Sequence, residues 1–233
     1  MLHPAADGFD PVAEANHRFA NHLAMLSGLA RLHSDRLAKA PTLSPAEAAQ
    51  SLVALSAKIE AIAKLHKMLA NPREQESIEL GPYLTDVVTG VVESLSQAGA
   101  IALSLSLDVA CRIDPSRALS IALIVCEMVT NSMKYAHPSG VAGRLSVRCV
   151  RTGAYVVIEV EDDGVGLPPG FDPAGNGHVG FRVVRSLTEQ LDATMKFHSD
   201  ELGVTFTLEV PFTDIGMSLD KPLATERRIA NGA

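Results

Sequence analysis

Two long helical patterns occupy the first seventy residues, and they constrain the fold more than any other feature of the sequence. Residues 9–39 contain one glycine and no proline after Pro11, and their apolar residues recur three or four positions apart, which is the spacing of one helix face. A similar pattern covers residues 45–70 and ends at an Asn-Pro pair, a common helix stop. Together the patterns predict a helical hairpin over residues 9–72.

The segment between the two predicted helices carries the residues that such a break needs. Pro41 stops the first helix, Ser44 can cap the second, and Pro45 suits its first position. Each helix has one apolar stripe, so a single hairpin would leave apolar surface in water. We therefore expect two hairpins to pair as a four-helix bundle in a homodimer.

After residue 78 the sequence mixes helix and strand signals, which is typical of an α+β domain. Alternating apolar and polar residues predict strands at 101–110, 143–153, 154–164 and 204–212. Helices are predicted at 80–97, 113–136 and 179–191, with Asp114 as the cap of the central one. We expect this domain to span residues 78–213 and residues 214–233 to form a flexible tail.

Composition narrows the possible partners and compartments. A net charge of −7 disfavours a nucleic-acid binder, which usually shows a basic surface. The three cysteines are far apart, so neither a disulfide framework nor a zinc site is predicted. The longest apolar run, residues 118–129, is too short to cross a bilayer, and the N-terminus lacks an export signal. We expect a cytoplasmic protein that neither binds nucleic acid nor spans a membrane.

The first chemical motif is "EMVTNSMKYA" in the central predicted helix. Glu127 and Asn131 are four residues apart and so lie on one helix face, with Lys134 close by. An amide oxygen is a hard ligand of the kind that Mg²⁺ accepts beside phosphate oxygens. Taken alone, the three residues fit a solvated stripe on an amphipathic helix equally well.

Two glycine-containing motifs follow the first one. "EDDGVGLP" comes directly after a predicted strand and contains Asp162, Gly164 and Gly166, where the absence of a Cβ allows a sharp turn and a close ligand. "GNGHVGFRVV" places Gly177 and Gly180 before a predicted helix, whose free N–H groups favour phosphate. Each motif alone also fits an ordinary turn.

In this order the three motifs, followed by "LGVTFTLEVPF", resemble the GHKL or Bergerat module of histidine kinases, gyrase-type ATPases and Hsp90 chaperones. The resemblance implies an α/β-sandwich that binds ATP and Mg²⁺, with Asn131 at the metal and Lys134 near phosphate charge. It implies that Asp162 accepts a hydrogen bond from the adenine amino group, with Thr205 as a minor adenine-side contact. Glu127 would polarise a water molecule or shape the metal shell, and the four motif glycines would approach the nucleotide.

The first predicted helix contains "EANHRFANHLAMLSGLARLH", residues 14–33. Its Glu14, His17, Arg18 and Asn21 resemble the phosphoacceptor motif of the second histidine-kinase dimerisation family, which is related to the HWE kinases. The resemblance implies that His17 is phosphorylated, with Arg18 and Asn21 assisting. A neutral imidazole can attack a phosphoryl group and pass it to a carboxylate. Without that context, an ordinary helix histidine would be the better interpretation.

The other histidines of the predicted hairpin have a different interpretation. His22 and His33 lie five and sixteen residues after His17, so they point elsewhere on the helix. We interpret both as ordinary surface or interface residues and His66 as a structural residue.

The sequence departs from the family pattern at several positions. Ala20 stands where the family usually has lysine, which removes a positive charge near the reacting phosphoryl group. Val179 replaces a family leucine, and residues 166–177 form a short loop for an ATP lid. Few residues precede the hairpin, so we expect that an input signal either comes from another chain, such as a separate sensor protein, or is absent.

Three functions stay open at this stage. The favoured one is an ATP-dependent protein histidine kinase that phosphorylates His17 and passes the group to a response-regulator aspartate. The second is an ATP-independent histidine phosphotransferase with a vestigial ATP domain, which the departure at Ala20 favours. The third is a non-catalytic protein that sequesters a regulator. In all three the partner is a receiver domain that docks on the hairpin.

Overall fold

The computed structural model describes residues 11–39, 44–71, 76–95, 101–107, 110–137, 141–171 and 179–212. Gly177 and the predicted tail at 214–233 lie outside these residues. The helices are α1 (Pro11–Lys39), α2 (Pro45–Leu69), α3 (Leu80–Leu95), α4 (Pro115–Tyr135) and α5 (Val179–Gln190). The strands are β1 (Ile78–Glu79), β2 (Ile101–Ser106), β3 (Arg112–Ile113), β4 (Gly143–Thr152), β5 (Tyr155–Asp162), β6 (Thr194–Asp200) and β7 (Gly203–Pro211).

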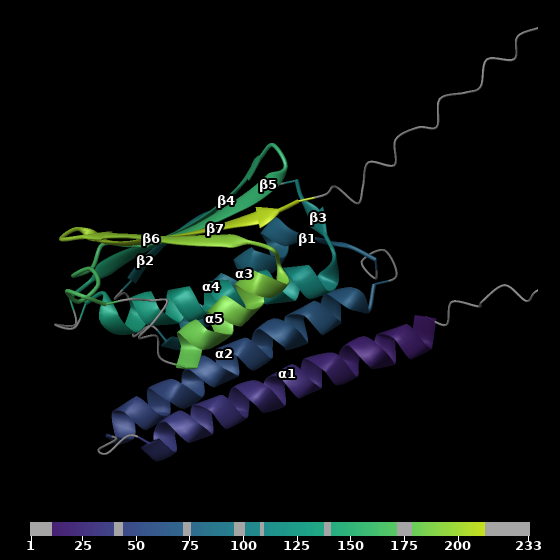
Figure 1. Cartoon of the computed structure of the whole chain (residues 1–233), viewed down its shortest axis with the longest axis horizontal. Coiled ribbons are helices and arrows are strands. Elements are labelled where there is room, and N and C mark those ends of the chain that lie inside the picture. Colours follow the sequence, from purple (N-terminus) through teal and green to yellow (C-terminus); the bar gives the residue numbers. More distant parts are fainter. Residues whose placement is uncertain are drawn as a thin grey trace, which may run out of the picture.

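Helices α1 and α2 form the predicted hairpin, and α2 begins at Pro45 as its capping signals indicate. Small and apolar residues of α2 such as Ala57, Ala61 and Leu65 are buried. They face α3 and α4, against which α2 packs (Figure 1). The hairpin therefore lies against the rest of the chain rather than standing apart from it.

The main sheet has five strands in the order β2-β4-β5-β7-β6. β2 runs parallel to β4, and the other neighbours are antiparallel. β1 and β3 form a separate antiparallel pair. Four of the five main strands agree with the prediction, but β6 and the short pair are not among the predicted strands.

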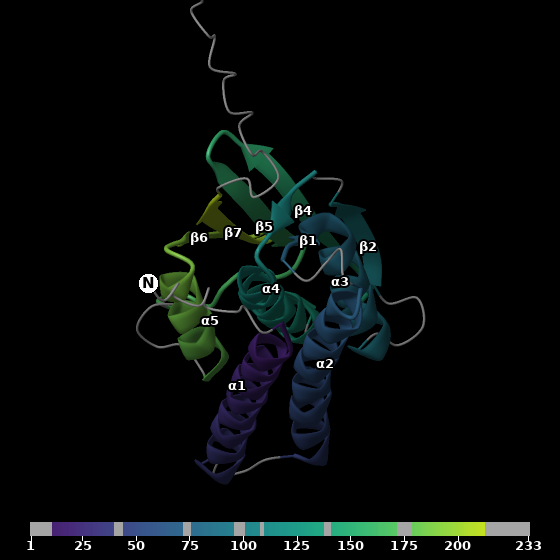
Figure 2. The same ribbon diagram turned by 90° about the vertical axis from the view of Figure 1, so that its right-hand side faces the viewer.

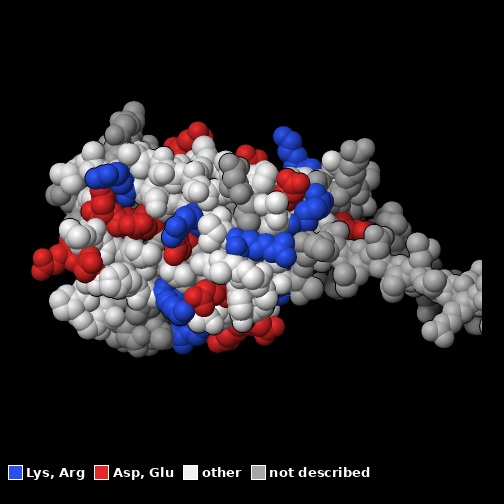
Figure 3. All heavy atoms as spheres, turned by 90° about the horizontal axis from the view of Figure 1, so that it is seen from above, with Lys and Arg blue, Asp and Glu red and all other residues white. Residues whose placement is uncertain are grey.

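Helices α3, α4 and α5 cover one face of the sheet, and the hairpin lies beneath these helices (Figures 1 and 2). The other face is open to solvent and carries charged side chains of both signs (Figure 3). Arg148 pairs there with Glu159, and Lys196 lies 2.8 Å from Glu209. The described charged residues on this face are therefore of both signs rather than of one.

The central helix α4 lies in the middle of the hydrophobic core. Asp114 caps it, because its carboxylate accepts hydrogen bonds from the backbone N–H groups of Ser116 and Arg117 at 2.8 and 3.2 Å. Residues 118–126 are all buried, since α4 has the sheet above it and α2 below it. A helix enclosed on both sides can be apolar all round.

The chemical environment of the cysteines agrees with the prediction of no disulfide. Cys111, Cys126 and Cys149 are buried, and none of the three is in a disulfide. Burial raises the pKa of Cys126 to about 12 and that of Cys149 to about 12, so these thiols stay protonated at neutral pH. No helix in the described part of the chain is both long and apolar enough to cross a membrane.

Candidate functional site

A cavity of about 350 Å³ lies between the C-terminal half of α4 and the sheet. Apolar side chains make up most of its wall, with five side chains that carry polar groups: Glu127, Asn131, Ser132, Tyr135 and Asp162. A mainly apolar cavity of this size with a few placed polar groups is typical of a small-molecule site. The cavity wall includes Glu127 and Asn131 of α4 and Asp162 of β5, which the sequence motifs single out.

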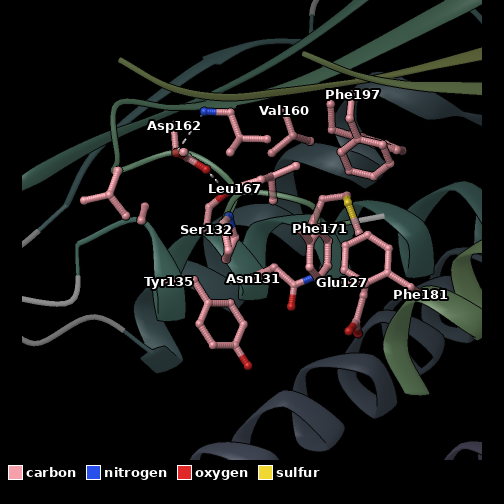
Figure 4. Close-up of a pocket in the computed structure, with 17 residues that line it drawn as sticks. Glu127, Asn131, Ser132, Tyr135, Val160, Asp162, Leu167, Phe171, Phe181 and Phe197 are labelled. Carbon is pink, nitrogen blue, oxygen red and sulfur yellow. Dashed lines mark hydrogen bonds between the residues drawn. The ribbon is translucent and has the colours of Figure 1, made fainter. Parts of the chain in front are cut away.

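Helical spacing brings the α4 residues to the cavity. Glu127, Asn131 and Tyr135 are four residues apart in turn, so their side chains lie along one face of the helix (Figure 4). Ser132 adds a hydroxyl next to Asn131. The sequence motif predicts Glu127 and Asn131, whereas Ser132 and Tyr135 are missed by it.

Asp162 ends β5 at the far side of the cavity and is only 7% exposed. Its carboxylate accepts hydrogen bonds from the Ser132 hydroxyl at 2.6 Å, the Gly164 N–H at 3.1 Å and the Val204 N–H at 3.3 Å. These three donors, two of which Figure 4 marks, fix the orientation of the carboxylate. A ligand donor entering the cavity would therefore meet a fixed acceptor.

The two glycines after Asp162 have separate structural reasons. A Cβ at Gly164 would overlap the backbone of Ala136 at the end of α4. Gly166 has φ +75° and lines the cavity, and a Cβ there would overlap the Asp200 carbonyl. The Val165 N–H donates to the Ala136 carbonyl at 2.9 Å, which holds the turn against α4. The glycines allow β5 to turn tightly beside the cavity.

Aromatic rings form one wall of the cavity. Phe171, Phe181, Phe197 and Phe206 follow one another with ring centroids 5.7, 5.7 and 5.0 Å apart. They come from a loop, α5, β6 and β7, so the wall joins elements that are distant in sequence. Such edge and tilted contacts stabilise the wall beyond simple burial.

Glu127 has a partner from the hairpin. Its Oε2 atom lies 2.6 Å from Nζ of Lys58, and the two side chains are only 13% and 2% exposed. Gly180, at the start of α5, packs against the same carboxylate so closely that a Cβ would overlap it. Lys58 is not among the predicted site residues, because nothing in the helical pattern around it indicates a contact with Glu127.

Asp163, next in sequence to Asp162, points out of the cavity. It accepts a hydrogen bond from the Arg144 N–H at 2.6 Å and lies 2.8 Å from His137 Nε2. These contacts, the Arg144 N–H first and His137 second, lower the pKa of Asp163 below its ordinary value. Its role is to join β4 to the end of β5.

Four of the described residues predicted to bind the cofactor are not among those that line the cavity: Lys134, Gly164, Gly180 and Thr205. Thr205 is a correction, because its neighbours Val204 and Phe206 line the cavity and strand alternation puts Thr205 on the opposite face. Lys134 is half-buried on α4 but is not part of the cavity wall. Gly177 lies outside the described residues.

The predicted phosphoacceptor residues lie on α1. His17 and Arg18 are in its first half, and their side chains lie outside the described part of the structure. Asn21 is exposed and lines a second, smaller cavity of about 200 Å³ together with the N-terminal part of α4 and the end of α5. The structure therefore does not bring Asn21 to the larger cavity.

The remaining hairpin histidines form an internal contact. His22 is 5% exposed, and its Nδ1 lies 3.0 Å from Nε2 of His66 across the two helices. The ring of Phe19 meets His66 edge-on at 5.2 Å. The structure therefore places His22 at the α1–α2 interface, and His66 has the structural role predicted for it. The side chain of His33 lies outside the described residues.

The residues of the larger cavity fit a nucleotide with its metal ion. Within the described part of the chain, the buried Nδ2 atom of Asn131 has no hydrogen-bond partner, and a buried polar group without one is costly unless a ligand or water satisfies it. Asp162 offers an oriented acceptor, and the apolar walls suit a planar base. No group of three potential metal-ligating His, Cys, Asp or Glu side chains occurs in the described ranges. Mg²⁺ takes several of its ligands from phosphate oxygens, for which one protein amide oxygen is a suitable companion.

Comparison with known proteins relates this arrangement to two families. Residues 14–95 match the family described as histidine kinase, and residues 116–214 match the family of histidine kinase-, DNA gyrase B- and HSP90-like ATPases. Blue-light-activated histidine kinase 2 of Erythrobacter litoralis is 27% identical over 93% of this chain and 60% of its own length. Sensor histidine kinase PdtaS of Mycobacterium tuberculosis is 26% identical over 86% of this chain and 39% of its own length.

A solved structure shares the fold. The histidine kinase domain of the blue-light-activated kinase EL346 from Erythrobacter litoralis superposes with a TM-score of 0.66. The match covers 87% of this chain and 91% of that domain at 24% sequence identity. The chain thus has the arrangement of a helical hairpin with an α/β domain, while spanning less than two thirds of the curated relatives it matches.

Proposed function

Because this chain belongs to the histidine kinases, with one family segment at 14–95 and a second at 116–214, we propose that it is an ATP-dependent protein histidine kinase. In this proposal it transfers the γ-phosphoryl group of ATP to His17 and then to an aspartate of a response-regulator receiver domain. The observation that carries the proposal is the cavity in which Asp162, held by three donors, faces Asn131 across apolar walls.

The cavity residues have distinct tasks in binding. Asp162 accepts the adenine amino group, and the Ser132 hydroxyl at 2.6 Å keeps its carboxylate in position. The amide oxygen of Asn131 supplies one ligand to Mg²⁺, and the phosphates supply others. The bound Mg²⁺ neutralises charge on the phosphate oxygens. Orienting the nucleotide in this way is a large part of phosphoryl-transfer catalysis.

The hairpin supplies the acceptor. A ring nitrogen of neutral His17 attacks the γ-phosphorus, so that an N–P bond forms while the P–O bond to the ADP leaving group breaks. Arg18, one residue on, brings positive charge to the phosphoryl oxygens, and Asn21 lies one turn further along α1. Glu127 is the candidate for accepting a proton or orienting water at the cavity. Phosphohistidine then passes the group to the receiver aspartate.

The hairpin also supplies a surface for a second copy of the chain. Phe19 and Leu23 of α1 are 50% and 46% exposed, and Leu52 and Ile59 of α2 are 62% and 45% exposed. Large apolar side chains gathered on two neighbouring helices favour burial against another helical pair. We therefore include a homodimer through the hairpins in the proposal.

An ATP-independent phosphotransferase is the second candidate. It is favoured by Ala20, which leaves no lysine beside the acceptor turn, and by Asn21 lying at the second cavity rather than at the larger one. The source of the phosphoryl group separates the two functions. The purified chain is incubated with γ-labelled ATP and Mg²⁺, or in parallel with a receiver domain phosphorylated on aspartate. Label acquired from ATP supports the kinase, and label acquired only from the receiver contradicts it and supports the phosphotransferase.

A further inference from the structure

One polar contact joins the helical hairpin directly to the nucleotide cavity. Lys58 of α2 reaches Glu127 of α4 at 2.6 Å, and the lysine is almost completely removed from solvent. A charge buried to this extent is costly unless it is paired, so the pair forms only when α2 is seated against α4. The contact therefore depends on docking of the hairpin.

The same contact occupies the Glu127 carboxylate. One oxygen is held by the Lys58 ammonium, and the other lies against the backbone of Gly180 at the start of α5. Figure 4 shows the Glu127 side chain at the cavity with its carboxylate directed toward the helices below it. A carboxylate enclosed in this way can neither reach a proton on His17 nor orient a water molecule at a phosphate.

The position of α1 also indicates that this arrangement is inactive. Asn21 lies beside Ser116 and Ser120 near the start of α4, whereas Asn131 and Tyr135 line the nucleotide cavity near its end. Ser120 and Asn131 are about 16 Å apart along the helix axis at the usual helical rise. The N-terminal ends of α1 and α4 lie on the same side of the molecule, away from this cavity (Figure 1). Phosphorylation of His17 within this arrangement requires the hairpin to move.

We propose that the Lys58–Glu127 ion pair is an autoinhibitory latch that holds the hairpin docked and withdraws Glu127 from the reaction. The inference rests on the proposed kinase function and assigns Lys58 as a positioning residue. Breaking the pair frees the hairpin to move and Glu127 to face the phosphates. The latch shifts a balance between docked and active arrangements, and its removal favours the active one.

Lys58→Met tests the latch, because methionine has a similar length and flexibility but no charge. Lys67→Met is the matched control: Lys67 is an exposed lysine on the same helix and is not part of the cavity wall. Lys58→Arg keeps the charge and should restore the wild-type behaviour. Two quantities are measured for each variant: the initial rate of His17 phosphorylation, and amide hydrogen exchange in α3, whose buried face packs on α2 and whose sequence is unchanged.

We expect Lys58→Met to phosphorylate His17 on the order of tenfold faster than the wild type, with faster exchange in α3. Lys67→Met should remain within about twofold for both quantities, as is usual for an exposed lysine. A rate for Lys58→Met equal to or below the wild-type rate, in a protein that melts cooperatively, would overturn the latch. A slower rate would instead indicate that the Lys58 charge assists transfer.

The exchange measurement keeps the latch testable if the kinase proposal fails. If no variant takes label from ATP, the proposed function is wrong. If α3 then exchanges faster in Lys58→Met but not in the control variant, the result still supports the role of the ion pair in docking the hairpin. Unchanged α3 exchange in Lys58→Met overturns that role. If Lys58→Met does not fold, Lys58→Gln, which keeps a donor toward Glu127 without charge, is judged by the same criteria.

Discussion

Asp162 and Asp163 are adjacent carboxylates with different tasks. Asp162 is buried and faces the nucleotide cavity, whereas Asp163 points toward β4 and His137. Strand alternation at the end of β5 separates them. Sequence reasoning could identify Asp162 because the glycines after it form a recognisable motif, but it could not identify Lys58, whose contact with Glu127 depends on how two helices pack.

The different tasks give a matched pair of substitutions. Asp162→Asn should weaken ATP binding by about 10- to 100-fold, since a charge-assisted hydrogen bond contributes roughly 1.5–3 kcal/mol. Asp163→Asn should change the affinity by less than about twofold, because Asp163 is not part of the cavity wall. Titration with a fluorescent ATP analogue measures both. Equal losses in the two variants would remove Asp162 from its proposed role.

Asp163 has its own effect on stability. Its pKa is lowered in the folded chain, so it stabilises the fold above the pKa that it has when unfolded, and this contribution is lost as pH falls through the folded pKa. Asp163→Asn should therefore lower the melting temperature at pH 7 by an amount worth less than about 1 kcal/mol, because the group is partly exposed. The difference from wild type should shrink in acid. Asp86→Asn, at an exposed position on α3, is the control, and a pH-independent difference for Asp163→Asn would contradict this account.

At the scale of elements, periodicity predicted the helices and most of the sheet. Asp114 and Pro115 predict the start of α4 because capping is local in sequence. β6 was missed, although Met195 and Phe197 alternate with polar residues in the way that could have indicated it. Thr205 was predicted to contact the adenine, but it lies on the other face of β7. The pairing of β7 with β5 determines that face, and the sequence of β7 alone does not reveal the pairing.

The chain between β6 and β7 packs closely against the backbone of Asp162. Gly203 has φ +135°, and a Cβ there would overlap the Asp162 carbonyl. Gly203→Ala should lower the free energy of unfolding by about 1–3 kcal/mol or more and should also weaken nucleotide binding. Gly153→Ala is the control, since Gly153 has φ +60° in open space and should cost about 1 kcal/mol without affecting binding. Urea unfolding of both variants tests the difference, and equal costs would show that the predicted overlap is relieved.

At the scale of the whole molecule, the apolar residues of the hairpin are divided between two surfaces, one against the nucleotide domain and one that remains exposed. One face of α2 packs on α3 and α4, and Leu52 and Ile59 on another face remain exposed. The sequence could predict an apolar stripe on each helix but not how the stripe is divided between the nucleotide domain and a second hairpin. That division depends on packing between segments distant in the chain.

The division predicts how the dimer can be broken. Leu52→Glu should convert a dimer into a monomer at micromolar concentration, because a charge buried in an apolar interface without a partner is costly. Leu202→Glu, at an 80% exposed position in the β6–β7 turn, should leave the mass unchanged. Light scattering during size-exclusion chromatography measures the mass. A monomeric wild type, or a dimer that persists in Leu52→Glu, would contradict pairing through the hairpin.

The central claim is that His17 accepts the phosphoryl group, and mapping the label within the chain tests it most directly. The wild type is incubated with γ-labelled ATP and Mg²⁺ and digested with trypsin under alkaline conditions that preserve phosphohistidine. Cleavage after Arg18 and Arg31 separates His17, in the peptide 1–18, from His22 in the peptide 19–31. His17→Gln distinguishes His17 from His3, the other histidine of the first peptide. The account predicts acid-labile label in the peptide 1–18 of the wild type and none in that of His17→Gln. Label in the peptide 19–31, or label that persists in His17→Gln, would contradict it.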